Sequence, residues 1–237
     1  MYFNNTTATY KSSLLGTVPH GFGTKQTGDG RDSELIKRLL KREEVNYKTI
    51  IVPFQTHSKK VAVITSSVGD LIYRPQNTDG VVTDQKGAVL TVVTADCVPI
   101  IYYDSKAEII GISHGGWKGT LNNIPAKVVR DMERVGGKRH NIRAVIGPSI
   151  NDCCYEIYGD RLKMFQERFG QTVLSRKENR MYVSLLKSNF LLLREAGLSQ
   201  RHIDYKLSCT FCNSREFYSY HRDRKINGEM FSFITLL

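Results

Sequence analysis

Apolar residues recur every three or four positions in the segment 33–41 (SELIKRLLK), and this spacing is typical of a helix with one buried face. Ser33 is the candidate N-cap, because its hydroxyl can accept a hydrogen bond from a free backbone N–H group. The same spacing runs through 122–135 until a glycine pair stops it. The pattern predicts further helices over 160–169 and 185–196.

Runs of β-branched and apolar residues predict strands, and 88–94 (AVLTVVT) is the clearest of them. We expect 100–103 to continue this strand after an interruption at 96–99, and 108–113 to return beside it as a hairpin. Weaker signals predict strands over 49–54, 61–65, 141–146, 206–208 and 230–236. Strands occur both in hairpins and between helices, so the pattern favours a mixed α+β fold over a regular βαβ series.

Length and charge bound the class of protein. The chain has 237 residues and a net charge of +11. We predict one domain over 1–237, which needs no metal merely to fold, because a chain of this size buries roughly 70% of its unfolded surface. The basic residues are scattered, so we expect an anionic small substrate and no specific nucleic acid. The basic residues could also form only a solvated surface with no binding role. A separate alternative is that the protein is a non-catalytic binding protein.

Nothing in the sequence predicts secretion or membrane insertion. The first residues lack a basic start followed by an apolar core. The longest nearly apolar stretch, Gly87 to Ala95, is far shorter than the ~20 residues of a membrane helix. We therefore expect a cytoplasmic monomer or weak homo-oligomer with no membrane partner, whose five cysteines are thiols or ligands.

Three potential metal ligands, His57, Cys97 and His114, lie beside predicted strand ends. Cys97 and His114 belong to one predicted hairpin, so their side chains can face each other. A Cys/His₂ set with an open fourth position is typical of catalytic zinc. From spacing alone, a buried structural cysteine and hydrogen-bonded histidines are the favoured interpretation over a metal site.

Two further patterns carry weaker signals. Cys209 and Cys212 form a CxxC pair that could be half of a zinc site or a redox pair. Cys153 and Cys154 are adjacent, and neighbouring thiols rarely chelate one metal together, so we do not expect them to complete a four-cysteine site. The run 114–119 (HGGWKG) reads as a tight turn before a helix, where backbone N–H groups could hold an anion.

Several motifs together resemble one family. They are Thr94–Pro99 (TADCVP), 114–119 (HGGWKG), 146–150 (IGPSI) followed by Tyr155-Glu156, Thr78–Gly80, Phe54–His57, His20–Phe22, and Phe217–Tyr220 with Arg222. They are similar to the laccase-domain family, first described as multicopper polyphenol oxidases and now regarded as zinc-dependent purine nucleoside phosphorylases. The resemblance spans nearly the whole chain.

The resemblance implies a four-layer α/β/β/α sandwich with zinc on His57, Cys97 and His114. It implies that phosphate attacks the anomeric carbon of adenosine, inosine, guanosine or methylthioadenosine, which releases the base and ribose 1-phosphate. Adenosine deamination would be a side activity. Cys97 and His114 would belong to the catalytic centre.

Other candidate roles follow from charge and position. Lys25, Lys118 and Arg222 are candidates for neutralising phosphate. Asp79 and Asp96 are candidates for stabilising a ribosyl cation or orienting a ligand, and Asp96 is equally a candidate capping residue. Gln55 is a candidate contact to substrate or bound water, and Trp117 could stack on a base or fill the core.

The sequence departs from the family pattern at several positions. Lysine replaces the usual arginine at 25 and 118, which keeps the charge but loses the bidentate guanidinium. His221 and Glu229 also stand where the family has arginine, and the segment after Lys25 is short. The preferred nucleoside and the affinity for phosphate therefore stay open.

Two alternative chemistries use the same residues. One is a metal-free hydrolase, such as an amidase for a cell-wall precursor, with Cys97 as nucleophile and His114 as base. The other is polyphenol oxidation with copper. Six histidines and no His-x-His pair are too few for a multicopper cluster, although copper could still occupy the thiolate–imidazole site.

Overall fold

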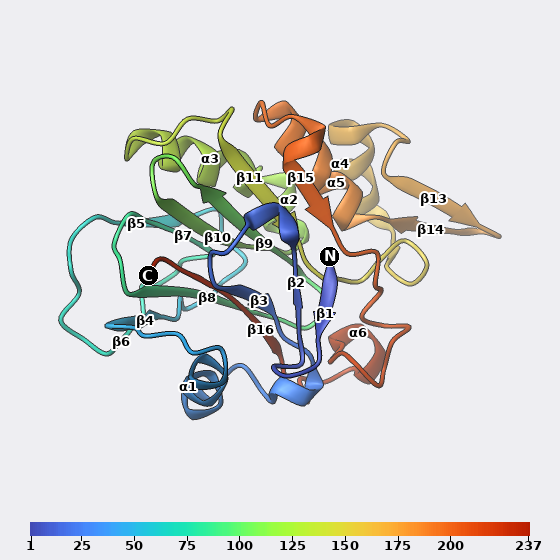
Figure 1. Ribbon diagram of the computed structural model, residues 1–237. Coiled ribbons are helices and arrows are strands. Elements are labelled where there is room, and N and C mark those ends of the chain that lie inside the picture. The colour runs from blue at the N-terminus through green and yellow to red at the C-terminus, as the bar shows by residue number, and fades with distance from the viewer.

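Two stacked β-sheets with helices on both outer faces make up the protein (Figure 1). The computed structural model describes residues 1–237. The strands are β1 (Tyr2–Asn4), β2 (Thr9–Lys11), β3 (His20–Phe22), β4 (Thr49–Ile51), β5 (Val61–Ile64), β6 (Ile72–Tyr73), β7 (Gly80–Thr83), β8 (Ala88–Thr94), β9 (Val98–Asp104), β10 (Ile109–Gly115), β11 (Ile142–Ile146), β12 (Glu156–Ile157), β13 (Leu174–Lys177), β14 (Arg180–Val183), β15 (Ile203–Tyr205) and β16 (Met230–Thr235). The helices are α1 (Ser33–Arg42), α2 (Trp117–Leu121), α3 (Ile124–Arg134), α4 (Gly159–Phe169), α5 (Leu185–Glu195) and α6 (Tyr220–Asp223), with short 3₁₀ helices at Ser13–Leu15, Lys25–Thr27 and Gln200–His202.

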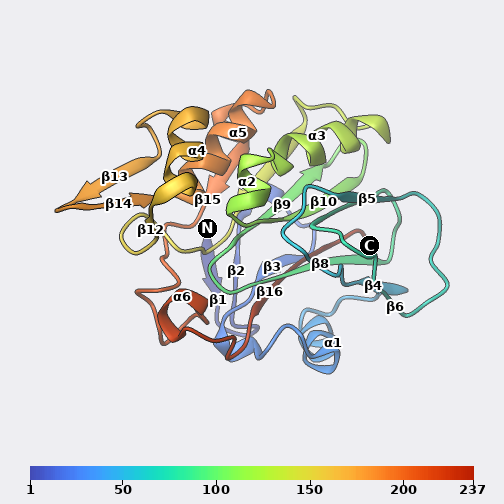
Figure 2. The ribbon, with the colours of Figure 1, turned by 180° about the vertical axis from the view of Figure 1, so that it is seen from behind.

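The seven-stranded sheet has the order β1-β2-β3-β16-β8-β4-β6, and the six-stranded sheet has the order β15-β11-β9-β10-β7-β5. Both mix parallel and antiparallel pairs. A small third sheet, β12-β14-β13, extends from one end of the sandwich (Figure 2).

Alternation along the central strands builds the layers. In β9, Ile100 and Tyr102 pack with helices α3 and α5, whereas Ile101 between them packs against the other sheet. In β8, Leu90 faces between the sheets and Val89 faces α1. Because successive side chains of a strand point to opposite faces, they form three apolar clusters, one between the sheets and one under each helical layer. This is the predicted four-layer α/β/β/α sandwich.

Helix α1 covers the seven-stranded sheet on its own (Figure 2). Its bounds agree with the prediction, but the N-cap is Asp32 and not Ser33, since the Asp32 carboxylate accepts the Glu34 N–H at 2.8 Å. An ionised cap also suits the positive end of the helix dipole better than a hydroxyl.

The expected continuation of 88–94 through 100–103 is wrong in one respect. Strand β8 lies in the seven-stranded sheet and β9 lies in the six-stranded sheet, so 95–97 is a crossover between layers. Asp96 takes a left-handed backbone with φ of 98° there. The predicted hairpin of β9 and β10 is confirmed, with His114 opposite Pro99.

Three other local expectations are corrected. The turn expected within 114–119 is replaced from Trp117 onward by the short helix α2 (Trp117–Leu121). Residues 206–208 are not a strand; the strand is Ile203–Tyr205, which pairs in parallel with β11. The N-terminal strands β1 to β3 were not predicted, because each has only three residues. No helix is long and apolar enough to cross a membrane.

Candidate active site

The three expected ligands come from three different segments. His57 lies in the loop after β4, Cys97 ends the crossover between the sheets, and His114 lies near the end of β10. Antiparallel pairing of β9 with β10 brings Cys97 and His114 together. The site therefore lies where the chain crosses from the seven-stranded sheet to the six-stranded sheet.

The side chains converge as a metal site requires. Their ligand atoms all lie within 4.8 Å of one another. The Cys97 Sγ atom is 3.8 Å from the His57 Nε2 atom, and the two imidazole rings meet edge to face with centroids 4.7 Å apart. Tetrahedral zinc with ordinary bond lengths would place such donors about 3.6 Å apart. One Cys and two His donors around an open position therefore fit a single zinc ion.

Asp79 holds both histidines in place. Its Oδ1 atom is 2.8 Å from His114 Nδ1 and accepts the His57 N–H at 3.0 Å. Its Oδ2 atom accepts the backbone N–H and the hydroxyl of Ser58 at 2.6 and 2.7 Å. With Nδ1 engaged, the Nε2 atom of His114 is left for a ligand role. His57 has a left-handed backbone with φ of 58°, which these bonds stabilise.

The Asp79 carboxyl is fully buried and does not line the neighbouring cavity. Burial alone would raise its pKa, but the bonds from His114 and Ser58 lower the pKa to about 2. Between its two sequence-based roles, this placement favours orienting the ligands over touching a ribosyl cation.

Electrostatics favour a thiolate at Cys97. Burial raises the pKa of this thiol, but the adjacent His114 outweighs burial and lowers the pKa. For His114 burial lowers the pKa, while the Cys97 thiolate and Asp79 raise it. The pair therefore tends toward thiolate and imidazolium, and the thiolate is the form that binds metal.

Gly116 makes room for the ligands. A Cβ atom there would lie 2.7 Å from His57 Cδ2 and 3.1 Å from Cys97 Sγ. Its φ of −69° is ordinary, so the glycine is required by space and not by backbone conformation.

A cavity of about 700 Å³ opens beside the triad and is lined by 22 residues, 11 of them hydrophobic. His57, Cys97 and His114 all belong to its wall. The volume lies in the usual range for small-molecule sites. Aromatic side chains supply much of the wall, namely Phe54, Trp117, Tyr155 and Tyr220.

The cations of the cavity wall are not those expected from the sequence. Arg31, Arg74 and Arg161 line the cavity. The Arg161 guanidinium lies 4.3 Å from the Trp117 ring centroid and donates to the Tyr155 hydroxyl at 3.3 Å. No sequence motif identified these arginines. Arg161 lies in the first turn of α4, the helix that follows the Tyr155-Glu156 motif.

The structure does not bring the three predicted phosphate-binding cations into that wall. Lys118 is exposed, with Nζ 5.5 Å from the Trp117 ring centroid. Lys25 donates to the carbonyl of Ser214 at 2.7 Å. Arg222 donates to the carbonyls of Thr210, Phe211 and Phe217 and pairs with Asp223, so its donors fasten a loop.

Asp96 and Gln55 line the cavity but are already hydrogen-bonded. Asp96 accepts the Thr210 hydroxyl at 2.6 Å and the backbone N–H of His221 at 2.8 Å, and its Oδ2 lies 3.0 Å from the imidazole Nδ1. Gln55 pairs both amide atoms with the backbone of Val93 at 2.8 Å. These contacts favour the capping interpretation of Asp96.

Two of the four positions that depart from the family pattern reach the cavity. His221 and Glu229 line its wall. Burial raises the pKa of the Glu229 carboxyl, although Arg31 and His114 oppose that shift. The cavity wall therefore contains a carboxyl group whose pKa lies above its ordinary value.

Comparisons with known proteins by sequence and by structure all point to one family. A family model described as multi-copper polyphenol oxidoreductase laccase matches residues 25–237. YlmD of Bacillus subtilis, named a purine nucleoside phosphorylase, is 32% identical over 77% of this chain and 69% of its own length. RL5 from an unknown prokaryotic organism, named an adenosine deaminase, is 33% identical over 79% of this chain and 75% of its own. The crystal structure of YfiH, a hypothetical protein of Bacillus licheniformis, superimposes with a TM-score of 0.85 at 29% identity over 94% of both chains.

Proposed function

The chain belongs to the multi-copper polyphenol oxidoreductase laccase family, and from that premise we propose that it is a zinc-dependent purine nucleoside phosphorylase. The observation that carries the proposal is the Cys/His₂ triad in the wall of a nucleoside-sized cavity. The substrates would be a purine nucleoside and phosphate, and the products the free base and ribose 1-phosphate.

His57, Cys97 and His114 would hold the zinc ion, with Asp79 orienting the His114 imidazole and fixing the backbone of His57. When bound, zinc would supply a Lewis acid that polarises an oxygen of phosphate or water. The site supplies three donors, His57, Cys97 and His114, which are enough for one ion only. The other four of the six histidines do not join this cluster. This argues against a multicopper cluster despite the family description.

We assign phosphate binding to the cavity arginines, in place of the lysines suggested by the sequence. Arg161 is the leading candidate, because Trp117 and Tyr155 fix its planar guanidinium at the wall. A fixed fork of N–H donors can hold two phosphate oxygens at once. The aromatic wall, which includes Phe54 and Trp117, offers ring faces on which a purine could stack.

Chemistry at the sugar needs both a nucleophile and a leaving group. A phosphate oxygen forms a bond to the anomeric carbon, the bond from that carbon to the purine nitrogen breaks, and its electron pair leaves with the base. The departing base must gain a proton or a hydrogen bond. Glu229 lines the cavity wall and burial raises the pKa of its carboxyl, so we propose this side chain as the candidate proton donor to the purine.

The proposal is tested with zinc-loaded protein, inosine and phosphate. We expect hypoxanthine and ribose 1-phosphate in equal amounts, and no reaction with the Cys97→Ala variant. Omitting phosphate separates phosphorolysis from hydrolysis, since hydrolysis would give free ribose. Protein that retains zinc but releases base from none of inosine, adenosine, guanosine and methylthioadenosine would overturn the proposal.

Adenosine deamination is a second candidate, and the similarity to RL5 favours it. It would use the same metal and cavity with water in place of phosphate. Incubation of adenosine without phosphate distinguishes it, since inosine is then the expected product. We propose that either reaction takes place in the cytoplasm, where a reducing environment would keep Cys97 available as a metal ligand.

A further inference from the structure

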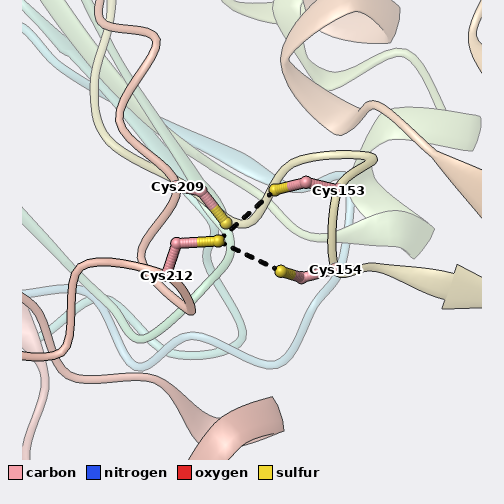
Figure 3. Close-up of side chains that lie close together, drawn as sticks. All are labelled: Cys153, Cys154, Cys209 and Cys212. Atoms are coloured by element: carbon pink, nitrogen blue, oxygen red, sulfur yellow. Dashed lines mark hydrogen bonds between the residues drawn. The ribbon is translucent and has the colours of Figure 1, made fainter.

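Four cysteines converge outside the cavity (Figure 3). Cys153 and Cys154 lie in the loop after β11, and Cys209 and Cys212 lie in the loop after β15. All four sulfur atoms lie within 4.8 Å of one another. This convergence goes against the sequence-based expectation that the adjacent thiols do not complete a four-cysteine site with the CxxC pair.

The sulfur spacing fits one tetrahedral ion. Cys212 Sγ lies 3.3 Å from Cys154 Sγ and 3.7 Å from Cys153 Sγ. Four thiolates at the usual zinc–sulfur bond length would be about 3.8 Å apart. Cys153 and Cys212 are exposed at the surface while Cys209 is buried, so an ion can enter and still be enclosed on its inner side.

The two loops are held in register by backbone contacts that do not depend on the thiols. Ser149 and Cys209 form an isolated parallel bridge, and the Thr210 N–H donates to the Ser149 carbonyl at 3.1 Å. Within the second loop, the Asn213 N–H donates to the Cys209 carbonyl at 3.1 Å. The backbone thus presents the four side chains to one point before any ion binds.

Nearby cations match the charge such a centre would carry. Zn²⁺ with four thiolates has a net charge of −2. The Lys177 ammonium donates to the Cys153 carbonyl at 3.0 Å, and the Arg222 guanidinium donates to the Thr210 carbonyl at 2.8 Å. Each loop is therefore bonded to a positive side chain, which favours the charged centre.

We propose that Cys153, Cys154, Cys209 and Cys212 bind a second zinc ion, structural and separate from the triad. A closed set of four sulfurs is typical of structural zinc, whereas a catalytic site keeps an open position. A disulfide would use two of the sulfurs and give no reason for the other two to converge. None of the four cysteines lines the cavity, so the ion would not meet substrate.

The second ion would stabilise the cavity wall from behind. Thr210, between Cys209 and Cys212, donates its hydroxyl to Asp96 at 2.6 Å, and Asp96 precedes the ligand Cys97. Tyr155, which follows Cys154, lies in the cavity wall. Fixing the two loops would therefore fix residues on both sides of the cavity.

Metal analysis of the purified protein tests the proposal, because the two sites make separate contributions. We expect about two zinc ions per chain in the unaltered protein. The paired variant Cys153→Ser/Cys212→Ser should keep one, and the matched variant Cys97→Ser should also keep one. Both altered thiols of the pair are exposed, so little packing is lost, and circular dichroism checks that the variants are folded.

Cobalt substitution gives a second readout that needs no variant. A four-thiolate site gives strong sulfur-to-cobalt charge-transfer bands, which should exceed those of the one-thiolate triad several-fold. One zinc per chain that Cys97→Ser removes entirely would overturn the proposal. So would iron in place of zinc, or a mass two daltons lower per disulfide with these thiols blocked to alkylation.

Discussion

Asp79 shows what a single buried carboxylate does at this site. It accepts hydrogen bonds from the segment that carries His57 and also fixes the tautomer of His114. The sequence placed Asp79 in the Thr78–Gly80 motif but left open whether it contacts the substrate or orients the metal ligands. Its complete burial favours the second role. At the scale of single residues, hydrogen-bond partners and free space determine the roles.

Gly116→Ala tests the space around the ligands. We expect loss of the triad zinc, because the added methyl would overlap His57 and press on Cys97 while the backbone conformation stays allowed. Zinc affinity measured with a competing chelator should fall at least tenfold. Gly69→Ala is the matched control, because a Cβ atom there meets nothing within 4 Å. Unchanged affinity in Gly116→Ala would contradict the geometry.

Arg161→Ala tests the assignment of phosphate binding. Losing charged hydrogen bonds worth about 1.5–3 kcal/mol should raise the KM for phosphate roughly 10- to 100-fold. The KM for inosine should change less. Arg168→Ala on the same helix is the control, since Arg168 pairs with Glu195 and lies outside the cavity wall. A phosphate KM equal in both variants would exclude Arg161.

The pH dependence of Cys97 tests its pairing with His114. In zinc-free protein the pKa of this thiol is lowered to about 6, against an unperturbed value of about 8.5. Because the folded value lies below the unfolded one, the lowered thiol pKa contributes stability that is fully present above about pH 8.5 and is lost as pH falls through about 6. Iodoacetamide labelling of Cys97, followed by peptide mass analysis, should be half-maximal near pH 6.

The variant that removes the partner is His114→Gln. Its labelling midpoint should move up, toward the ordinary thiol value, because the opposing positive charge is gone. If the midpoint stays near 6 in this variant, another group must hold the thiolate.

At the scale of elements, alternation in β9 decides which layer each side chain joins. Ile101 is completely buried between the sheets, while its neighbours Ile100 and Tyr102 face the helices. Ile101→Ala leaves a cavity in a rigid region and should reduce the free energy of unfolding by about 2–5 kcal/mol. Urea unfolding measures this loss.

Val63→Ala in the edge strand β5 is the control for that measurement. Val63 is 42% exposed, so its truncation should cost below about 1 kcal/mol. Equal losses in the two variants would mean that the layers are not packed as described.

At the scale of the whole molecule, three apolar clusters support the fold without metal. Removing both ions with a strong chelator should therefore leave the far-ultraviolet circular dichroism nearly unchanged. The Tm should fall and recover when zinc is restored, since a ligand present at about 1,000 times its Kd stabilises by about 4 kcal/mol. Complete unfolding by the chelator would show that metal is needed to fold.

The sequence by itself determined the central elements and the metal triad. The run 88–94, the hairpin that follows it and the helix 33–42 are specified by local periodicity, which a single chain displays directly. The motifs around Cys97 and His114 identified the family and predicted three ligands, whose side chains the structure brings together.

Only the tertiary structure decided which residues from distant segments share a wall. The crossover at 95–97 into a different sheet, Arg161 against Trp117, and the meeting of Cys153 and Cys154 with Cys209 and Cys212 all join segments far apart along the chain. Local pattern carries no record of such contacts, because they depend on how sheets stack and loops meet. For the same physical reason we propose that phosphate binds to cavity arginines that no motif identified, in place of the predicted Lys25, Lys118 and Arg222.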